Sequence, residues 1–330
     1  MQPSSIAASV DFDRDGIQHG FLKMPFSRDD SAWGAVMIPI TVVRNGSGPT
    51  VLFTGGNHGD EYEGPIALFD LAATLRAEEI NGRAIIVPAM NYPAFEVGRR
   101  TSPIDGGNLN RVFPGRPDGT VTEKIADYFQ RYLLPLADIV VDIHSGGRTL
   151  DFLPFAAIHV LDDAAQQERC RAAMAAFNAP YSLTLVELHS VGMYDSAAEE
   201  MGKVFVSTEL GGGGGASAGT VAIAKRGVRN VLRHAGILAG DIEGGPSVKL
   251  DMPDPRCYVT SESNGLLEMC ADLGVSVRAG QVIARVHPAD RTGVTPIDYH
   301  AGIDGVLVGR HFPGLVKMGD FLSLVAVATP

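Results

Sequence analysis

Short apolar runs rich in Val and Ile alternate with longer amphipathic segments along most of the chain. The runs are bounded by Gly, Pro or polar residues and predict buried strands at 51–54, 84–87, 139–143 and 204–207. Apolar residues at helical spacing predict helices at 64–79, 122–134, 164–177 and 220–238. In the first helix, the expected buried stripe comprises Ile66, Leu68, Phe69, Leu71, Ala72 and Leu75. This alternation favours an α/β fold with a mostly parallel sheet covered by helices on both faces.

The pattern changes near residue 245, where predicted helices give way to short strands between Gly- and Pro-containing turns. We expect a small β-barrel or sandwich at 250–330, with strands at 266–269, 282–286, 305–308 and 322–327. The first 50 residues also have a β pattern, with a strand at 36–43. The sequence therefore predicts an α/β domain at 1–245, β-rich at its start, and a C-terminal β domain.

Composition narrows the class of protein. The chain has 27 Lys and Arg against 38 Asp and Glu, a formal charge of −11, which disfavours nucleic acids and anionic membranes as partners. The longest apolar stretch, around 132–143, is interrupted by Pro and Asp and is too short to span a bilayer. The three cysteines are widely spaced, which argues against a disulfide framework and fits a cytoplasmic protein.

Candidate chemistry lies where three predicted strands end. His58 and Glu61 follow the first strand, His144 ends the third, and Glu209 ends the fourth. Ligands of parallel sheets bind at the carboxyl ends of strands, so these side chains are expected to face one crevice. Two imidazoles and a carboxylate form the ligand set of a catalytic zinc with one open position. Glu209 is then a second carboxylate, available to take a proton from water.

Each of these residues alone has an ordinary structural explanation. An isolated HxxE is more often a solvated helix cap, and a histidine at a strand end is usually a hydrogen-bonded core residue. Their joint occurrence, with glycines beside each of them, favours the metal site.

A fourth segment adds cationic and amide groups. Asn110 and Arg111 supply a planar fork for a carboxylate, and a second arginine upstream, Arg99 or Arg100, is available to polarise a scissile carbonyl. For an isolated arginine, a surface ion pair would be the better interpretation.

Together these motifs are specific. GGNHGDEYEGP, NLNRVFPG, DIHSGG and TELGGGG, in this order, resemble the succinylglutamate desuccinylase and aspartoacylase family, relatives of the zinc carboxypeptidases. The resemblance implies a carboxypeptidase-like mixed sheet and one Zn²⁺ per chain on His58, Glu61 and His144. It also implies Glu209 as general base and acid. The same family pattern implies Asn110 and Arg111 on the substrate carboxylate, and an arginine, placed on Arg100, near the carbonyl.

Within the family, SAWGAVMIPI and SPIDGGNLNRVFPG resemble the branch that cleaves N-acetyl-L-2,4-diaminobutyrate to acetate and the diamino acid. Aspartoacylases carry an arginine before the catalytic Glu, whereas this chain has Asp195 and Glu199 in that stretch. These two carboxylates are expected to attract a substrate ammonium group. Solvated helix-surface charges are an equally good interpretation.

The C-terminal segment resembles biotinyl or lipoyl carrier barrels, but the stretch 295–304 lacks the lysine that a carrier needs. We therefore expect a lid or an oligomer surface, with association of copies left open. The expected partner is a small N-acyl amino acid. A desuccinylase, an aspartoacylase-type enzyme, a carboxypeptidase for short peptides and a non-catalytic binding protein are the alternatives.

Overall fold

The computed structural model describes residues 3–185 and 191–329. Its main sheet contains ten strands before residue 210: β1 (Ala7–Ala8), β2 (Gly16–Pro25), β3 (Ala35–Asn45), β4 (Thr50–Gly55), β5 (Gly82–Val87), β6 (Ile139–His144), β7 (Leu150–Phe152), β8 (Phe155–His159), β9 (Tyr181–Leu185) and β10 (Val204–Glu209). Strands β5, β4, β6 and β10 form a parallel block, and β1 to β3 extend it as an antiparallel edge. The predicted α/β fold with a mixed sheet is confirmed, and its parallel part is this central block.

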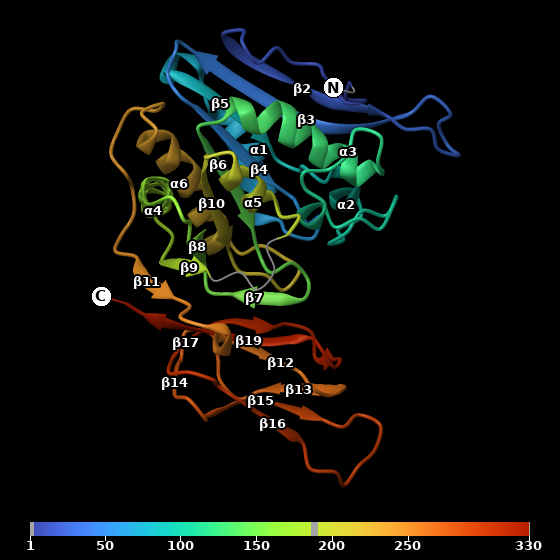
Figure 1. The fold of residues 1–330 in the computed structure, drawn as a ribbon, viewed down its shortest axis with the longest axis vertical. Helices are drawn as coiled ribbons and strands as arrows, with labels where there is room; N and C mark the ends of the chain where they lie inside the picture. The colour runs from blue at the N-terminus through green and yellow to red at the C-terminus, as the bar shows by residue number, and fades with distance from the viewer. Residues whose placement is uncertain (1–2, 186–190, 330) are drawn as a thin grey trace.

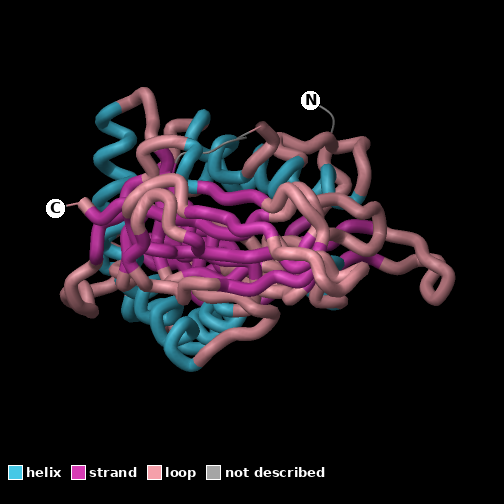
Figure 2. The backbone as a smooth tube through the Cα atoms, turned by 90° about the horizontal axis from the view of Figure 1, so that it is seen from below, coloured by secondary structure: helices cyan, strands magenta, loops and turns pink. Residues whose placement is uncertain are grey.

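Helices cover both faces of this sheet (Figures 1 and 2). They are α1 (Glu63–Thr74), α2 (Tyr92–Glu96), α3 (Val121–Tyr128), α4 (Ala164–Phe177), α5 (Tyr194–Glu200) and α6 (Ala218–His234). Helices α1, α4 and α6 pack on the face that presents Val51 and Phe53, whereas α3 and α5 pack on the face that presents Leu52. Alternate residues of β4 thus enter opposite cores, as the period of two of a strand requires. None of the helices in the described residues is long and apolar enough to cross a membrane.

Three predicted helices extend too far, among them the one expected at 220–238, which ends at His234. Helix α1 ends at Thr74, because Leu75 has an extended backbone and a separate turn follows at Ala77–Glu79. Helix α3 ends at Tyr128 and passes into a wider turn at Phe129–Leu133. The expected apolar stripe of α1 is also wrong in part: Ile66 is 41% and Phe69 45% exposed. Only the face with Leu68 and Leu71 packs into the core, so the buried stripe contains fewer residues than the apolar positions of this segment predicted.

The C-terminal part is antiparallel β structure, as expected from its sequence. It comprises β11 (Val248–Asp251), β12 (Tyr258–Thr260), β13 (Gly265–Met269), β14 (Ser276–Val277), β15 (Val282–His287), β16 (Ile297–His300), β17 (Gly305–His311), β18 (Leu315–Val316) and β19 (Phe321–Ala328). Strand β11 pairs with β9 on one side and with β19 on the other, so the main sheet continues into this part (Figure 1). One hydrophobic core joins Phe155 and Leu183 to Leu307 and Val325.

Candidate metal centre

The three expected metal ligands come together at the carboxyl ends of β4 and β6. His58 and Glu61 lie in the turn between β4 and α1, where Gly56 adopts a left-handed φ of +61° that lets the chain reverse. His144 is the last residue of β6. A Cβ on Gly59 would lie 2.1 Å from the carbonyl carbon of Ala94, so only glycine allows this turn to pack against α2.

The side chains of this triad point at one another. Glu61 Oε1 lies 2.7 Å from His58 Nδ1, and Glu61 Oε2 lies 2.8 Å from His144 Nδ1. One ligand atom from each residue lies within 4.8 Å of the other two, and all three side chains are buried. The set is consistent with a single metal ion held by two imidazoles and one carboxylate.

The outer nitrogens of both histidines already have partners. His58 Nε2 lies 3.2 Å from Asn108 Oδ1, and His144 Nε2 lies 2.7 Å from Asp142 Oδ2. An acceptor at Nε2 holds the proton there and leaves Nδ1 as the ligand atom, which is the usual arrangement around protein-bound metals. The hydrogen bonds of the outer nitrogens therefore support a metal ion independently of the geometry of the three ligand atoms.

Asp142 is in turn held by two donors. Thr54 Oγ1 donates to its Oδ1 at 2.7 Å, and Asn57 Nδ2 donates to its Oδ2 at 2.9 Å. Sequence reasoning missed both Asp142 and Asn108. The signal for Asp142 was present, because residues 142 and 144 are two apart on a strand and face the same side.

Burial and neighbouring charges shift the pKa values of His144 and Glu61 in opposite directions. Burial lowers the pKa of His58. Burial also opposes the charged form of His144, but the carboxylates of Asp142 and Glu61 outweigh it and raise the pKa of His144 well above its usual value. For Glu61, burial raises the pKa, but the two adjacent imidazoles lower it by more and hold it below the usual range.

Glu209 faces this cluster from the neighbouring strand. It pairs in register with His144 across β6 and β10, so the two side chains project from the same side of the sheet. The side chain is partly exposed, but its Oε2 is shielded from solvent and has no hydrogen-bond partner among the described residues. Burial, followed by the negative charge of Glu61, raises its pKa to about 8. A carboxyl group with such a pKa can accept a proton and donate it again near neutral pH.

The structure places Arg100 and not Arg99 against the triad. Arg100 Nη1 lies 3.6 Å from Glu61 Oε1, and its side chain is 44% exposed. Arg99 contributes its backbone carbonyl, which accepts a hydrogen bond from the Gly59 N–H at 2.9 Å. The arginine that sequence reasoning placed near a scissile carbonyl is therefore the one beside the candidate metal ligands.

Asn110 and Arg111 lie on the short turn Leu109–Arg111. Asn110 is buried, and its Oδ1 accepts the Tyr194 N–H at 2.9 Å, which leaves its Nδ2 as the group to offer a ligand. Arg111 is exposed, and its Nη1 donates to the Asn110 carbonyl at 2.6 Å.

Asp195 and Glu199 have a partner within the protein. Glu199 Oε1 lies 3.1 Å from His159 Nδ1, and Asp195 Oδ2 lies 3.9 Å from His159 Nε2. His159 follows Phe155, the register partner of Glu209, by four residues, about 13 Å along the strand. Contact of these two carboxylates with a substrate ammonium group stays a prediction, and in the structure both of them already lie against the imidazole of His159.

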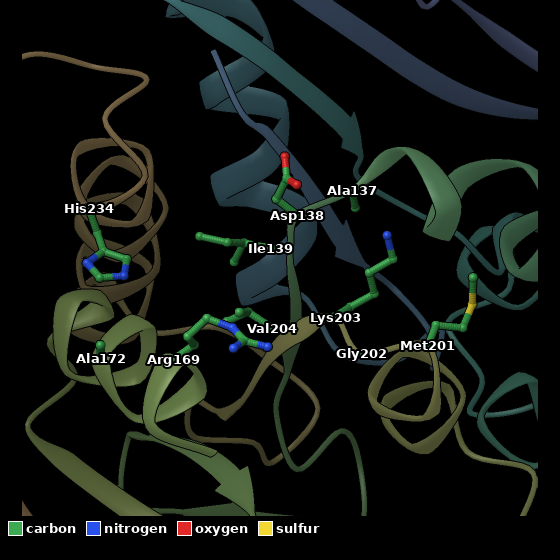
Figure 3. Close-up of a pocket in the computed structure, with 10 residues that line it drawn as sticks. All are labelled: Ala137, Asp138, Ile139, Arg169, Ala172, Met201, Gly202, Lys203, Val204 and His234. Atoms are coloured by element: carbon green, nitrogen blue, oxygen red, sulfur yellow. The ribbon is translucent and has the colours of Figure 1, made fainter. Parts of the chain in front are cut away.

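A hollow of about 470 Å³ at the other ends of β6 and β10 contains none of the predicted site residues (Figure 3). Its walls include Asp138, Arg169, Lys203 and His234. In the register of the two strands, Ile139 and Val204 pair at this end, whereas His144 and Glu209 pair at the opposite end. The groups suited to hydrolysis thus gather at the carboxyl ends of the parallel strands.

A mixed α/β sheet that brings two histidines and a glutamate together, with a further glutamate at the next strand end, is consistent with a hydrolase that holds a single metal ion. Residues 47–235 match the family described as the succinylglutamate desuccinylase/aspartoacylase catalytic domain. The chain belongs to this family.

Similar proteins match over nearly the whole chain. N-alpha-acetyl-L-2,4-diaminobutyric acid deacetylase from Halomonas elongata is 58% identical over 327 residues, 98% of this chain and 96% of that protein. The product-bound structure of the ectoine utilization protein EutE (DoeB) from Ruegeria pomeroyi is 64% identical, with a TM-score of 0.97 over 99% of this chain and 100% of the other. A structure described as a succinylglutamate desuccinylase from Silicibacter sp. is 62% identical, with a TM-score of 0.96 over 100% of both chains.

Proposed function

We propose that this chain hydrolyses the acetyl amide of N-alpha-acetyl-L-2,4-diaminobutyrate to acetate and L-2,4-diaminobutyrate, as a step of ectoine breakdown. Support comes from the full-length similarity to a deacetylase of that substrate. The observation that carries the chemistry is Oε2 of Glu209, which has no hydrogen-bond partner within 3–185 and 191–329 and lies beside the His58–Glu61–His144 triad.

Zinc is the proposed metal, because two imidazoles and one carboxylate form a known catalytic zinc set. A zinc ion at these ligands supplies Lewis acidity, which polarises a carbonyl and makes water a better acid. The protein contributes the orientation of its ligands: Asp142 and Asn108 hold the outer nitrogens of the two histidines.

Glu209 is the proposed base and acid. Its carboxylate accepts a proton from the attacking water, the water oxygen forms a bond to the acetyl carbon, and the amide C–N bond then breaks. The same carboxyl group returns the proton to the leaving nitrogen, so that water and amide yield acetate and amine. Burial raises the pKa of this carboxyl group, which favours its holding the proton between the two steps.

Three further residues bind and orient the substrate in this proposal. Arg100 donates to the acetyl carbonyl oxygen as negative charge develops there. Asn110 Nδ2 and the Arg111 guanidinium hold the carboxylate of the amino acid. Asp195 and Glu199 are left out of this mechanism because His159 lies between them.

A substrate panel tests the proposal. Metal-loaded protein is assayed with N-alpha- and N-gamma-acetyl-diaminobutyrate, acetylaspartate, succinylglutamate and blocked dipeptides. We expect the N-alpha-acetyl compound to be cleaved with the highest kcat/KM, by a factor of at least about 10. Faster cleavage of acetylaspartate or succinylglutamate would assign the chain to the other activities of its family, and cleavage of dipeptides would make it a carboxypeptidase.

A further inference from the structure

The hollow at the starts of β6 and β10 brings together basic side chains from three elements. Arg169 belongs to α4, Lys203 to the turn before β10, and His234 is the last residue of α6. They lie around Ile139 and Val204, the first residues of the two strands (Figure 3). The three cationic groups come from distant parts of the sequence, so the fold and not a local basic run creates this cluster.

The positive charge of the hollow is not neutralised within the part of the chain that the structure describes. There, neither Arg169 nor Lys203 makes an ion pair, and the Lys203 Nζ donates to the Pro135 carbonyl at 3.3 Å. The wall also contains the carboxylate of Asp138, which accepts the Thr50 N–H at 2.8 Å. Because the whole chain has a formal charge of −11, a hollow with more basic than acidic groups runs against the overall charge.

The floor of the hollow is apolar. Ile139 and Val204 are buried, and Ala137 and Ala172 add further apolar surface. The volume of about 470 Å³ falls within the range of small-molecule sites, roughly 300–1,000 Å³. An apolar floor with cationic side chains around it suits a ligand that has a short apolar part and an anionic group.

We propose that this hollow binds a small organic anion, whose carboxylate or phosphate monoester group is held by Arg169 and Lys203. The guanidinium of Arg169 can donate two parallel N–H bonds to such a group, and the Lys203 ammonium adds a compact positive charge. A ring N–H of His234 supplies a further donor. The apolar part of the ligand lies on Ile139 and Val204.

This anion site is separate from the candidate metal centre. Ile139 and His144 are the two ends of β6, and five residues of rise place them about 16 Å apart along the strand. Val204 and Glu209 are the two ends of β10 in the same way. A small anion in the hollow therefore occupies a second site and does not contact the groups suited to hydrolysis.

Isothermal titration of the metal-loaded protein tests the site. Butyrate and propyl phosphate are the probes, and the tighter of the two tells which anionic group the site prefers. Saturable binding of at least one probe is expected, with an affinity that falls as salt is added. Absence of saturable binding for both probes overturns the proposal.

Variants show where the probe binds. Arg169→Gln and Lys203→Gln should each weaken binding by about 10-fold, because each removes a charged donor from the anion. Arg278→Gln, at an exposed arginine of the C-terminal part, is the matched control and should bind like the unmodified chain. Melting temperatures check that the three variants fold. Unchanged affinity in Arg169→Gln and Lys203→Gln would place the probe elsewhere, the candidate metal centre included, and contradicts the proposal.

Pyridoxal 5′-phosphate provides a direct chemical readout, because it carries both a phosphate monoester and an aldehyde. The aldehyde condenses with the neutral amine of Lys203 with loss of water, and added borohydride reduces the imine to a stable secondary amine. Mass spectrometry should find this adduct at Lys203 in preference to Lys317, an exposed lysine of the C-terminal part. An excess of the bound probe should protect Lys203. Equal labelling of the two lysines, or labelling that the probe does not reduce, rules out an anion site at Lys203.

Discussion

At the residue scale, the site contains two carboxylates with opposite properties. Glu61 lies between two imidazoles, which hold its pKa below the usual range, whereas Oε2 of Glu209 has no partner among the described residues. The first suits a permanent metal ligand and the second a group that gains and loses a proton. Environment, and not residue type, assigns the two roles.

Substitution of Glu209 by Gln should lower kcat by a factor of about 10² to 10⁴, the range of general acid–base catalysis. The ligands are untouched, so bound metal measured by atomic emission should stay near one per chain. Glu200→Gln, in the same region but on the solvent side of α5, should keep full activity. Unchanged turnover in Glu209→Gln would rule out the proposed proton transfer.

The same residue gives the metal-free protein a pH dependence. The Glu209 pKa is about 8 in the folded protein against an ordinary value of 4.5, so the folded state retains a proton that the unfolded state loses. Its stabilising effect is complete below pH 4.5 and is lost as the pH rises through 8. Melting temperatures in chelator should fall over this window by a few degrees more for the unmodified chain than for Glu209→Gln. Parallel curves for the two proteins would contradict the raised pKa.

Asp142 acts on the metal through His144. Asp142→Asn replaces the carboxylate at His144 Nε2 by a neutral amide and should weaken metal affinity by about 10- to 100-fold, measured by competition with a chelator. Asp138→Asn is the control: this residue precedes the same strand and accepts the Thr50 N–H at the far end. Equal metal affinity in the two variants would show that Asp142 is not needed to orient the ligand.

At the element scale, the glycine run after β10 closes onto the segment that follows His144. The Gly213 N–H bonds to the Leu150 carbonyl, and Gly212 has a φ of +152°. A Cβ on Gly212 would lie 2.0 Å from the Leu150 carbonyl oxygen. The glycine at this position therefore admits another stretch of backbone.

Gly212→Ala should therefore destabilise the protein by about 1–3 kcal/mol, because it adds backbone strain and a contact that must shift. Urea unfolding measures the change. Gly215→Ala is the control, since no atom lies within 4 Å of its Cβ position and its φ is not in the left-handed region. If both variants changed the free energy of unfolding equally, the change would come from the conformational freedom of glycine in general and not from the close approach of Gly212 to Leu150.

At the scale of the whole molecule, the C-terminal part is built into the main sheet. Strand β11 joins β9 to β19, and β7 pairs with β17. The core between them includes Phe152 and Phe155 from the α/β part. The two predicted domains thus share apolar surface.

Removal of residues 247–330 should leave this surface exposed and yield a chain that aggregates. Expression of 1–246 alone, followed by measurement of the soluble fraction and of bound metal, checks this. A soluble, metal-binding fragment would show that the α/β part folds by itself and that the domain boundary near 245 is independent.

The local pattern of the sequence was sufficient to locate the central strands and the candidate residues at their ends. Runs of Val and Ile located β4, β5, β6 and β10, and polar residues at the ends of three of these strands indicated His58, Glu61, His144 and Glu209. Periodicity and residue type are local properties, so they can be read without the fold. Helix ends were less accurate, because the end of α1 depends on the backbone of one residue, Leu75.

Only the tertiary structure decided which distant groups touch. Glu61 and His144 are 83 residues apart in the chain yet 2.8 Å apart in space. The proximity of Arg100 to Glu61, the pairing of Glu199 with His159 and the exposure of Trp33 likewise follow from packing between segments. No local pattern contains these facts, because a contact between segments depends on the register of strands and the packing of helices across the whole sheet.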